Sequence, residues 1–229
     1  MYENERFERN IGAITCDEQE LLKTKKAVIA GCGGLGCHTA EFLARLGIGF
    51  ITIIDGDAFT ASNLNRQLNS LETNLGKSKV HETRERLLQI RADLPVNVFN
   101  VFLNEENAGK LLEGHDIIID ALDSVKTRLL LEKKASKLDI PLVHGAVQEW
   151  SAQVSTIFPG DFTLSRLYQG DYHENSDREK PSVLSFTAAF CASLEASEAV
   201  KVLLGRGSLL RKKLLTVDLK ENTFDIISL

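Results

Sequence analysis

Short apolar runs recur along the first two thirds of the chain and alternate with longer amphipathic segments. The apolar runs have the length of buried strands and cover residues 27–30, 50–54, 96–102, 117–119 and 141–143. Helical periodicity marks the segments around them, at residues 17–23, 37–46, 78–90, 105–112 and 126–138. This alternation predicts a Rossmann-like, doubly wound α/β fold with a mostly parallel sheet.

The pattern changes after Gly145. A strand, a polar and mobile loop without regular structure, and a long helix are expected in that order, at 153–158, about 159–182 and 183–204. Residues 214–219 and 223–227 predict a closing antiparallel pair. The sheet should therefore carry a C-terminal antiparallel extension, and 229 residues fit a single domain.

Composition and charge argue against several functional classes. The net charge of −5 disfavours a nucleic-acid or anionic membrane surface, which needs a basic excess. No stretch approaches the roughly 18 apolar residues of a membrane span, and the first residues lack a signal-peptide pattern. The four cysteines show neither a disulfide framework nor a metal-binding pair. We therefore expect a cytoplasmic protein without zinc.

A glycine-rich loop joins the predicted strand at 27–30 to the helix that follows. Its glycines, Gly31, Gly33, Gly34 and Gly36, let the backbone approach phosphates, and N–H groups at the helix start favour an anion. Asp55 ends the next strand, nineteen residues after Gly36, where it can accept hydrogen bonds from ribose hydroxyls. This motif fits ATP and NAD equally well.

The polar segment after the second strand favours a triphosphate. Arg66 can fork onto phosphate oxygens, Lys79 supplies a point charge, and Asn63 and Gln67 can donate to phosphate. Such cations suit an enzyme from which pyrophosphate leaves, because negative charge grows on that group. Asp57, at the start of the segment, completes the predicted nucleotide-binding set.

Asp123 follows the predicted strand at 117–119, at the sheet edge where open α/β sheets bind ligands. A carboxylate there suits Mg²⁺, which takes few protein oxygens in addition to substrate phosphates. Capping of the helix that begins near Lys126 is the alternative role for Asp123. The sequence leaves both roles open.

Taken in order, these segments resemble the ThiF–MoeB–HesA family, whose members are relatives of the ubiquitin-activating enzymes. The resemblance covers nearly the whole chain and rests on residues 6–9, 31–36, 55–57, 62–67, 76–79, 120–123 and 193–201. It implies an ATP- and Mg²⁺-dependent adenylyltransferase of thiamine, molybdopterin or related sulfur metabolism. Its substrate would be the C-terminal Gly-Gly carboxylate of a small ubiquitin-like sulfur-carrier protein, which becomes an acyl-adenylate as pyrophosphate leaves.

The resemblance also implies roles for individual residues. The residue that matches Asp55 holds the ATP ribose, and the one that matches Asp123 holds Mg²⁺. Those that match Asn63, Arg66 and Lys79 hold the phosphates.

By the same resemblance the enzyme is a homodimer, in which Arg9 reaches into the partner subunit's site. A surface ion pair of Arg9 with Glu5 or Glu8 is the alternative. Residues 1–229 would form one ThiF-type adenylation domain. Its expected parts are an N-terminal helical arm, a nucleotide-binding core and a carrier-binding extension, at residues 1–25, 26–145 and 146–229.

The cysteines depart from the family pattern. Many relatives bind zinc through two Cys-x-x-Cys pairs, which this sequence lacks. Some relatives join the carrier covalently through a cysteine ahead of the long helix, but residues 159–181 contain none. Cys191 lies at helical spacing from Thr187 and Leu194, which favours a packed core thiol. We therefore expect adenylation without an obligatory enzyme–carrier bond, and a separate sulfur donor.

Other functions fit the sequence less well. Some relatives adenylate a carboxylate on tRNA or on a peptide, but the net negative charge and the Asn-Leu-Asn sequence of residues 63–65 favour a protein substrate. An NAD-dependent oxidoreductase accounts for the glycine loop and Asp55 only. A non-catalytic half of a heterodimeric activating enzyme typically lacks the phosphate-binding residues, which this chain retains.

Overall fold

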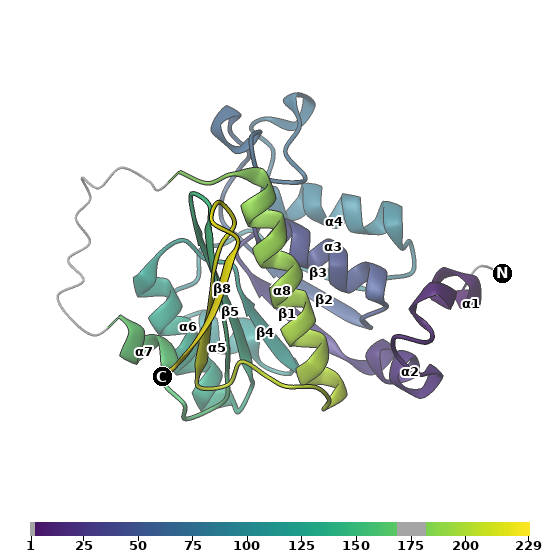
Figure 1. Cartoon of the computed structure of the whole chain (residues 1–229). Helices are drawn as coiled ribbons and strands as arrows, with labels where there is room; N and C mark the ends of the chain where they lie inside the picture. Colours follow the sequence, from purple (N-terminus) through teal and green to yellow (C-terminus); the bar gives the residue numbers. More distant parts are fainter. Residues whose placement is uncertain (1–2, 169–181) are drawn as a thin grey trace.

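The computed structural model describes residues 3–168 and 182–229. In this part of the chain eight strands form one sheet, in the order β3-β2-β1-β4-β5-β6-β7-β8 (Figure 1). The strands are β1 (Lys26–Ala30), β2 (Phe50–Ile54), β3 (Val96–Phe99), β4 (Ile117–Asp120), β5 (Leu142–Gln148), β6 (Ser151–Ile157), β7 (Lys213–Asp218) and β8 (Thr223–Ser228). Neighbouring strands from β3 to β5 run parallel, and those from β5 to β8 run antiparallel. The predicted fold class is confirmed.

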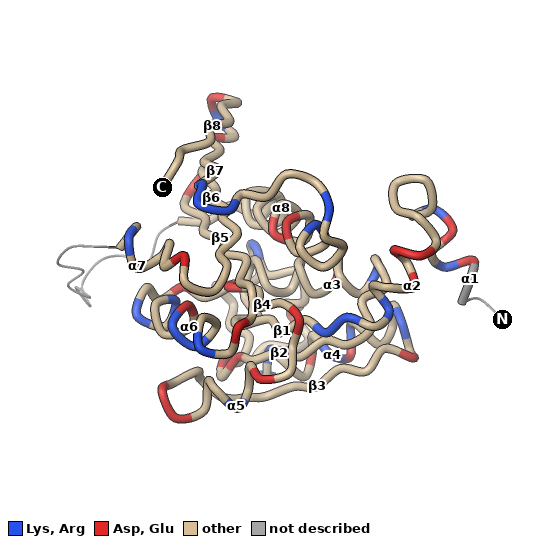
Figure 2. Tube along the Cα trace, turned by 90° about the horizontal axis from the view of Figure 1, so that it is seen from below, with Lys and Arg blue, Asp and Glu red and all other residues tan. Residues whose placement is uncertain are grey.

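Helices cover both faces of the sheet (Figure 2). The α-helices are α1 (Glu3–Arg6), α2 (Cys16–Thr24), α3 (Gly36–Leu46), α4 (Lys79–Ile90), α5 (Ala108–Leu112), α6 (Val125–Leu138), α7 (Thr163–Leu167) and α8 (Ser185–Leu204). The 3₁₀ turns are η1 (Glu8–Asn10), η2 (Ala61–Asn63) and η3 (Glu72–Asn74). Across residues 3–168 and 182–229, the structure has no helix with the length and apolar character that crossing a bilayer requires.

Alternate residues of the central strands pack into two apolar cores. On β1, Ala27 and Ile29 pack with α3, α4 and α8, whereas Val28 and Ala30 pack with α5 and α6. Successive side chains of a strand point to opposite faces, so a strand covered on both sides is apolar at every position. This is why uninterrupted apolar runs predicted the central strands.

The largest differences from the predicted boundaries lie in β3 and β5. β3 ends at Phe99 because its partner β2 ends at Ile54, directly opposite. Phe102, predicted inside the strand, is 67% exposed. β5 runs on to Gln148 and forms a hairpin with β6, which begins at Ser151. Because this hairpin contains polar residues, its full extent was not predicted from the apolar runs.

A short helix, α7, lies within the segment that the sequence predicts as an irregular loop, and that part of the prediction is wrong. Glu132 of α6 stabilises its start by accepting hydrogen bonds from the backbone N–H groups of Leu164 and Ser165, at 2.7 and 2.9 Å. Leu164 is fully buried. The long-range partner Glu132 explains why local sequence did not predict this helix. Residues 169–181 of the predicted loop lie outside the described residues.

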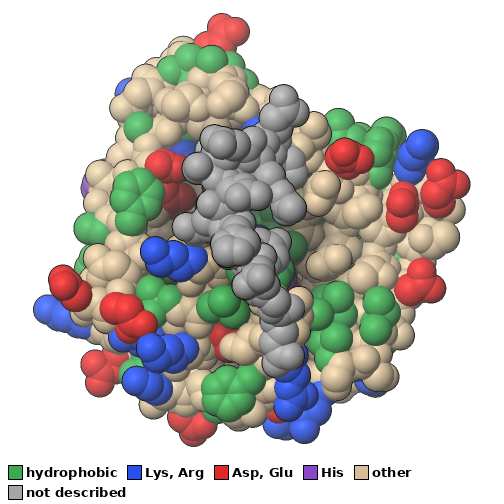
Figure 3. Space-filling view, turned by 90° about the vertical axis from the view of Figure 1, so that its left-hand side faces the viewer, with side chains coloured by type: hydrophobic (Ala, Val, Ile, Leu, Met, Phe, Trp, Pro, Cys, Tyr) green, Lys and Arg blue, Asp and Glu red, His purple; other side chains and the backbone are tan. Residues whose placement is uncertain are grey.

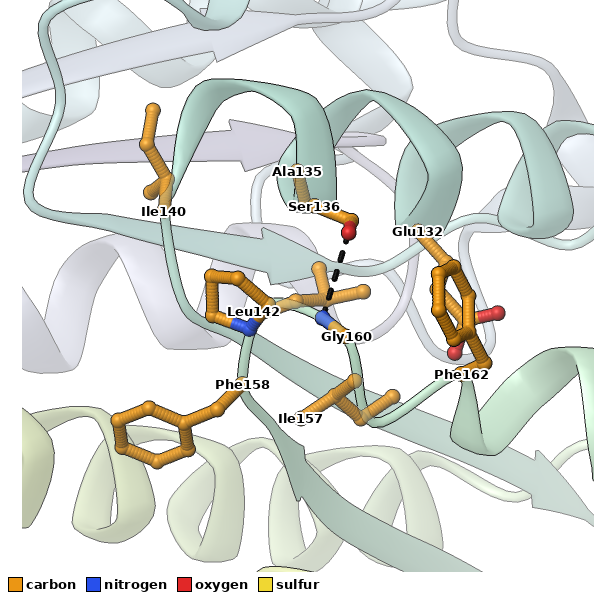
Figure 4. A pocket seen from close by; sticks show the side chains of 10 residues that line it. Glu132, Ala135, Ser136, Ile140, Leu142, Ile157, Phe158, Gly160 and Phe162 are labelled. Carbon is orange, nitrogen blue, oxygen red and sulfur yellow. Dashed lines mark hydrogen bonds between the residues drawn. The ribbon is translucent and has the colours of Figure 1, made fainter.

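A small cavity beside α7 is too small to hold a ligand. It has a volume of about 10 Å³ and lies between α6 and the turn after β6 (Figure 4). A hydrogen bond from the Gly160 N–H to the Ser136 hydroxyl, at 3.2 Å, crosses it. A cavity of this size is at the lower limit for one water molecule, so we assign it to packing.

Candidate functional site

Two glycines of the loop between β1 and α3 are required by the fold itself. Gly31 has a φ of +95°, and a Cβ atom there would lie 2.5 Å from the Ala121 carbonyl oxygen. A Cβ atom at Gly36 would lie 2.0 Å from the Gly31 carbonyl oxygen. Any larger residue at either position must displace backbone. These two glycines close the turn and bring α3 against the sheet.

The other two glycines leave open space. The nearest atom to a Cβ at Gly33 would be Nε2 of Gln67, at 3.7 Å. A Cβ at Gly34 would meet Ala188 Cβ at 3.4 Å and Arg66 Cγ at 3.6 Å, both ordinary contacts. Neither glycine has a left-handed φ. The protein alone therefore gives no steric reason for glycine here, whereas a phosphate group lying against the backbone would.

Asp55 stabilises the glycine loop through hydrogen bonds to the backbone. One of its carboxylate oxygens accepts a hydrogen bond from the Cys32 N–H at 2.7 Å, and the other accepts one from the Asp57 N–H at 2.8 Å. Each oxygen keeps a lone pair for a further donor. Asp55 is half-buried at the end of β2, so it can also accept from a ribose hydroxyl.

Lys79 and Asp57 form an ion pair, which the sequence did not indicate. The Lys79 ammonium lies 2.9 Å from Asp57 Oδ2, and the Lys79 side chain is 8% exposed against 53% for Asp57. The lysine is therefore fixed and largely desolvated at the start of α4. A phosphate that binds Lys79 must share this ammonium with Asp57.

The segment at 62–67 places polar groups beside the open glycines. Arg66 Nη1 donates to the Ser62 carbonyl oxygen and to Asn65 Oδ1, at 2.9 and 2.8 Å. In the described part of the chain the Arg66 guanidinium has no carboxylate partner, so its charge is available to an anion.

Gln67 is 6% exposed, and its Nε2 lies nearest to the space beside Gly33. Its Oε1 is buried without a hydrogen-bond partner among residues 3–168 and 182–229. Asn63 instead stabilises the local turn, since its Oδ1 accepts from the Thr60 N–H at 2.9 Å. The Gln67 Nε2 is therefore placed to donate to a phosphate that lies beside Gly33.

Asp123 lies in the turn after β4, next to the glycine loop. The side chain is exposed, and it does not cap α6. That role falls to Ser124, whose hydroxyl accepts from the Thr127 N–H at 3.4 Å, so the capping alternative for Asp123 is wrong. Within the described residues no three His, Cys, Asp or Glu side chains gather as a metal site. A single carboxylate still fits Mg²⁺, which completes its coordination with phosphate and water.

Arg9 is exposed in η1, within the N-terminal arm. Phe7, two residues before Arg9, packs against the C-terminal end of α3. Its Cε1 would lie 3.1 Å from a Cβ atom at Gly47, the residue that follows this helix. The glycine loop lies at the other end of α3, about 16 Å away for an eleven-residue helix. Arg9 does lie at the surface, but within the described residues it forms no ion pair with Glu5 or Glu8, so that part of the alternative is wrong.

Cys191 is a packed core thiol, as predicted. It is fully buried in α8, and its Sγ donates to the carbonyl oxygens of Ala146 and Gln153, at 3.7 and 3.6 Å. Burial raises the pKa of Cys191 well above its usual value. A neutral, enclosed thiol is a poor nucleophile.

Two buried ionisable residues near the site were not singled out from the sequence. His144 donates from Nδ1 to Asp120 at 2.7 Å, and burial lowers the pKa of His144, so the ring is neutral at pH 7. Glu195 of α8 is fully buried against Gly145, and burial raises its pKa well above the usual value. Their signal lies in long-range contacts, which a single sequence does not display.

Comparison with known proteins identifies the family. The sequence pattern of the ThiF family matches residues 7–229. The chain belongs to the ThiF family. It is 32% identical to the molybdopterin-synthase adenylyltransferase of Haemophilus influenzae, over 93% of this chain and 89% of that protein. The enzyme of the same name from Escherichia coli is 32% identical, over 88% and 82% of the two chains.

Solved structures and a further relative agree with this placement. The crystal structure of E. coli MccB with ATP has a TM-score of 0.87 and 26% identity, covering 99% of this chain and 72% of that one. The SAMP-activating enzyme E1 of Haloferax volcanii is 28% identical over 97% and 84% of the two chains. As a ThiF-family member this protein is an adenylyltransferase, a class that uses ATP. The alternative of an NAD-dependent oxidoreductase is therefore wrong.

Proposed function

We propose that this ThiF-family protein adenylates the C-terminal Gly-Gly carboxylate of a small ubiquitin-like sulfur-carrier protein, with ATP and Mg²⁺. The observation that carries the proposal is the open backbone at Gly33 and Gly34, flanked by Gln67 and by the guanidinium of Arg66, which has no carboxylate partner among the described residues. An anion-binding surface of this kind suits the phosphates of ATP. The names of the relatives from Haemophilus influenzae, Escherichia coli and Haloferax volcanii support a carrier protein as the substrate.

In the proposed reaction, a carboxylate oxygen of the carrier attacks the α-phosphorus of ATP. The bond between the α- and β-phosphates breaks, and pyrophosphate leaves with the electron pair. No general base is needed, because the carboxylate is already ionised at pH 7. Arg66 and Lys79 would offset the charge that grows on pyrophosphate, and Asp55 would orient the ribose. Asp123 would hold Mg²⁺, which supplies further positive charge to the phosphates.

The carrier would bind the C-terminal extension, residues 146–229. Its last strand, β8, pairs only with β7 among the described strands and exposes apolar side chains. Phe224 is 58% exposed and Ile226 is 61% exposed. Figure 3 shows a face of the molecule on which hydrophobic groups are interspersed with both basic and acidic side chains. Exposed apolar area at an open strand edge suits a protein partner.

The active form would be a homodimer in which Arg9 completes the partner subunit's site. The position of the arm, one helix length from its own glycine loop, supports a role across the interface. A two-fold dimer would make both sites equivalent. An arginine contributed in this way would stabilise the transition state as an arginine finger does.

A peptide substrate is the second candidate, because E. coli MccB was crystallised with MccA, at 26% identity and a TM-score of 0.85. This chain covers 72% of MccB but 89% of the Haemophilus influenzae relative. A carrier protein is therefore the better-supported substrate.

Carrier-dependent exchange of pyrophosphate into ATP tests the proposal. Asp123→Ala should lower the exchange rate by about 10²–10³, the usual cost of removing an electrostatic contact to the transition state. Asp17→Ala is the matched control, since Asp17 is also an exposed aspartate at a helix start, in α2. Its exchange should equal that of the wild type. Normal exchange by a folded Asp123→Ala protein would remove Asp123 from the proposed mechanism.

A further inference from the structure

Arg128 holds the turn that carries Asp123. From the start of α6, its Nε and Nη2 donate to the Leu122 carbonyl oxygen, at 3.1 and 2.5 Å. Nη1 donates to the Tyr168 hydroxyl at 3.1 Å, and Nη2 also donates to the Gly145 carbonyl oxygen at 3.5 Å. One guanidinium thus ties the turn to β5 and to the end of α7.

The charge of Arg128 is matched by a buried carboxylate. Asp120 is fully buried, and its Oδ2 lies 3.8 Å from Arg128 Nε while accepting from His144 Nδ1 at 2.7 Å. Burial alone would lower the pKa of Arg128, but the charge of Asp120, together with the smaller contributions of Tyr168 and Asp123, outweighs burial and raises that pKa. A buried ion pair adds little net stability, because desolvation offsets the attraction. The role of the Arg128–Asp120 pair is instead to fix the backbone at Leu122.

Asp123 has no comparable support of its own. Its exposed carboxylate has neither a hydrogen bond nor an ion pair within residues 3–168 and 182–229. The direction of the side chain is therefore set by the backbone on its two sides. Arg128 holds Leu122 on one side, and the cap of α6 holds Ser124 on the other.

We propose that Arg128 is a positioning residue for the metal, which fixes residues 121–123 so that Asp123 meets a Mg²⁺ ion bound with ATP. This inference rests on the proposed function, in which Asp123 holds that ion. Arginine suits the position because its planar fork donates to several acceptors at once. A lysine would keep a charge beside Asp120 but could not also hold Leu122, Gly145 and Tyr168.

Calorimetric titration of ATP, with and without Mg²⁺, tests this inference. In the wild type Mg²⁺ should strengthen ATP binding. Arg128→Gln and Asp123→Asn should each lose most of this gain, about tenfold, within the range typical of coupled sites. In neither variant should Mg²⁺-free ATP affinity fall, because neither change removes a contact to ATP itself. The double variant should lose no more than either single variant, because both changes remove the same interaction.

Arg91→Gln is the matched control. Arg91 is also buried and donates to a backbone carbonyl oxygen at 2.5 Å, that of Ile48 before β2. This variant should melt at a lower temperature yet keep the gain from Mg²⁺. Arg128→Lys should lose the gain as Arg128→Gln does, and it retains the ion pair if the glutamine variant does not fold.

Three outcomes would overturn the inference. Wild-type ATP binding that is indifferent to Mg²⁺ would refute the metal role in the proposed function, and the positioning role with it. Loss of the Mg²⁺ gain in Asp123→Asn but not in the Arg128 variants would refute the positioning role alone. An equal loss in Arg91→Gln would show a general effect of removing buried arginines.

Discussion

Alanine substitutions at Gly33 and Gly36 should separate nucleotide binding from folding. The two glycines lie three positions apart in one loop, yet they face different surroundings. A methyl group at Gly33 enters open space, with Gln67 Nε2 nearest at 3.7 Å, whereas one at Gly36 would lie 2.0 Å from a backbone oxygen. The first change should therefore affect the ligand, and the second should affect the protein.

The magnitudes follow from these contacts. Gly33→Ala has no left-handed φ to strain, so its stability should stay within about 1 kcal/mol of the wild type, or 2–4 °C in Tm. If the methyl group displaces a phosphate from one backbone N–H, the loss is about 1.5–3 kcal/mol, which weakens ATP binding by roughly 10- to 150-fold. Gly36→Ala should cost about 3 kcal/mol or more, because backbone must move to admit the methyl group.

Calorimetry with ATP and thermal unfolding measured on the same samples give both quantities. The Gly33→Ala protein should fold and bind ATP weakly, whereas the Tm of the Gly36→Ala protein should fall by roughly 6 °C or more. Wild-type ATP affinity in Gly33→Ala would refute the argument that open backbone at this position accommodates a phosphate.

Three further predictions concern other parts of the molecule. Replacing Cys191 by serine should leave carrier adenylation intact, and an obligatory carrier adduct on Cys191 by mass spectrometry would contradict this. Burial raises the folded-state pKa of Glu195, so the folded wild type loses stability as pH rises above the unfolded-state pKa of this carboxyl. Glu195→Gln should therefore melt at a higher temperature than the wild type at pH 8 and at the same temperature at pH 4. Equal melting temperatures at pH 8 would refute the burial argument. Mixing inactive Arg9→Ala and Asp123→Ala proteins should restore activity in mixed dimers, and failure after demonstrated subunit exchange would place Arg9 outside the partner subunit's site.

The central sheet was predictable because burial on both faces makes its strands apolar throughout. The run at 27–30 predicts β1 within one residue. The hairpin of β5 and β6 was less predictable, since its ends mix polar and apolar residues around a turn at Glu149, whose φ is +52°. Helix α7 depends on Glu132, thirty-one residues before its first residue, and distant partners leave no local pattern.

The candidate site was likewise predictable from the sequence only in part. Glycine spacing and the position of Asp55 predicted a nucleotide loop, because those residue types are needed where strand meets helix. The pairing of Lys79 with Asp57 and the contacts of Arg128 with Gly145 and Tyr168 were not predictable, since each joins segments that only the fold brings together. Arg128 also looks like an ordinary helix-surface cation in the sequence.

The central claim is that this protein transfers AMP to the C-terminal carboxylate of a carrier protein. The most direct measurement is the intact mass of a small ubiquitin-like protein ending in Gly-Gly, after incubation with this protein, ATP and Mg²⁺ and removal of pyrophosphate by pyrophosphatase. The carrier should become heavier by one adenylyl group, and no such species should form when its final glycine is removed. An unmodified mass for every carrier from the same genome, with ATP bound and the enzyme folded, would contradict it.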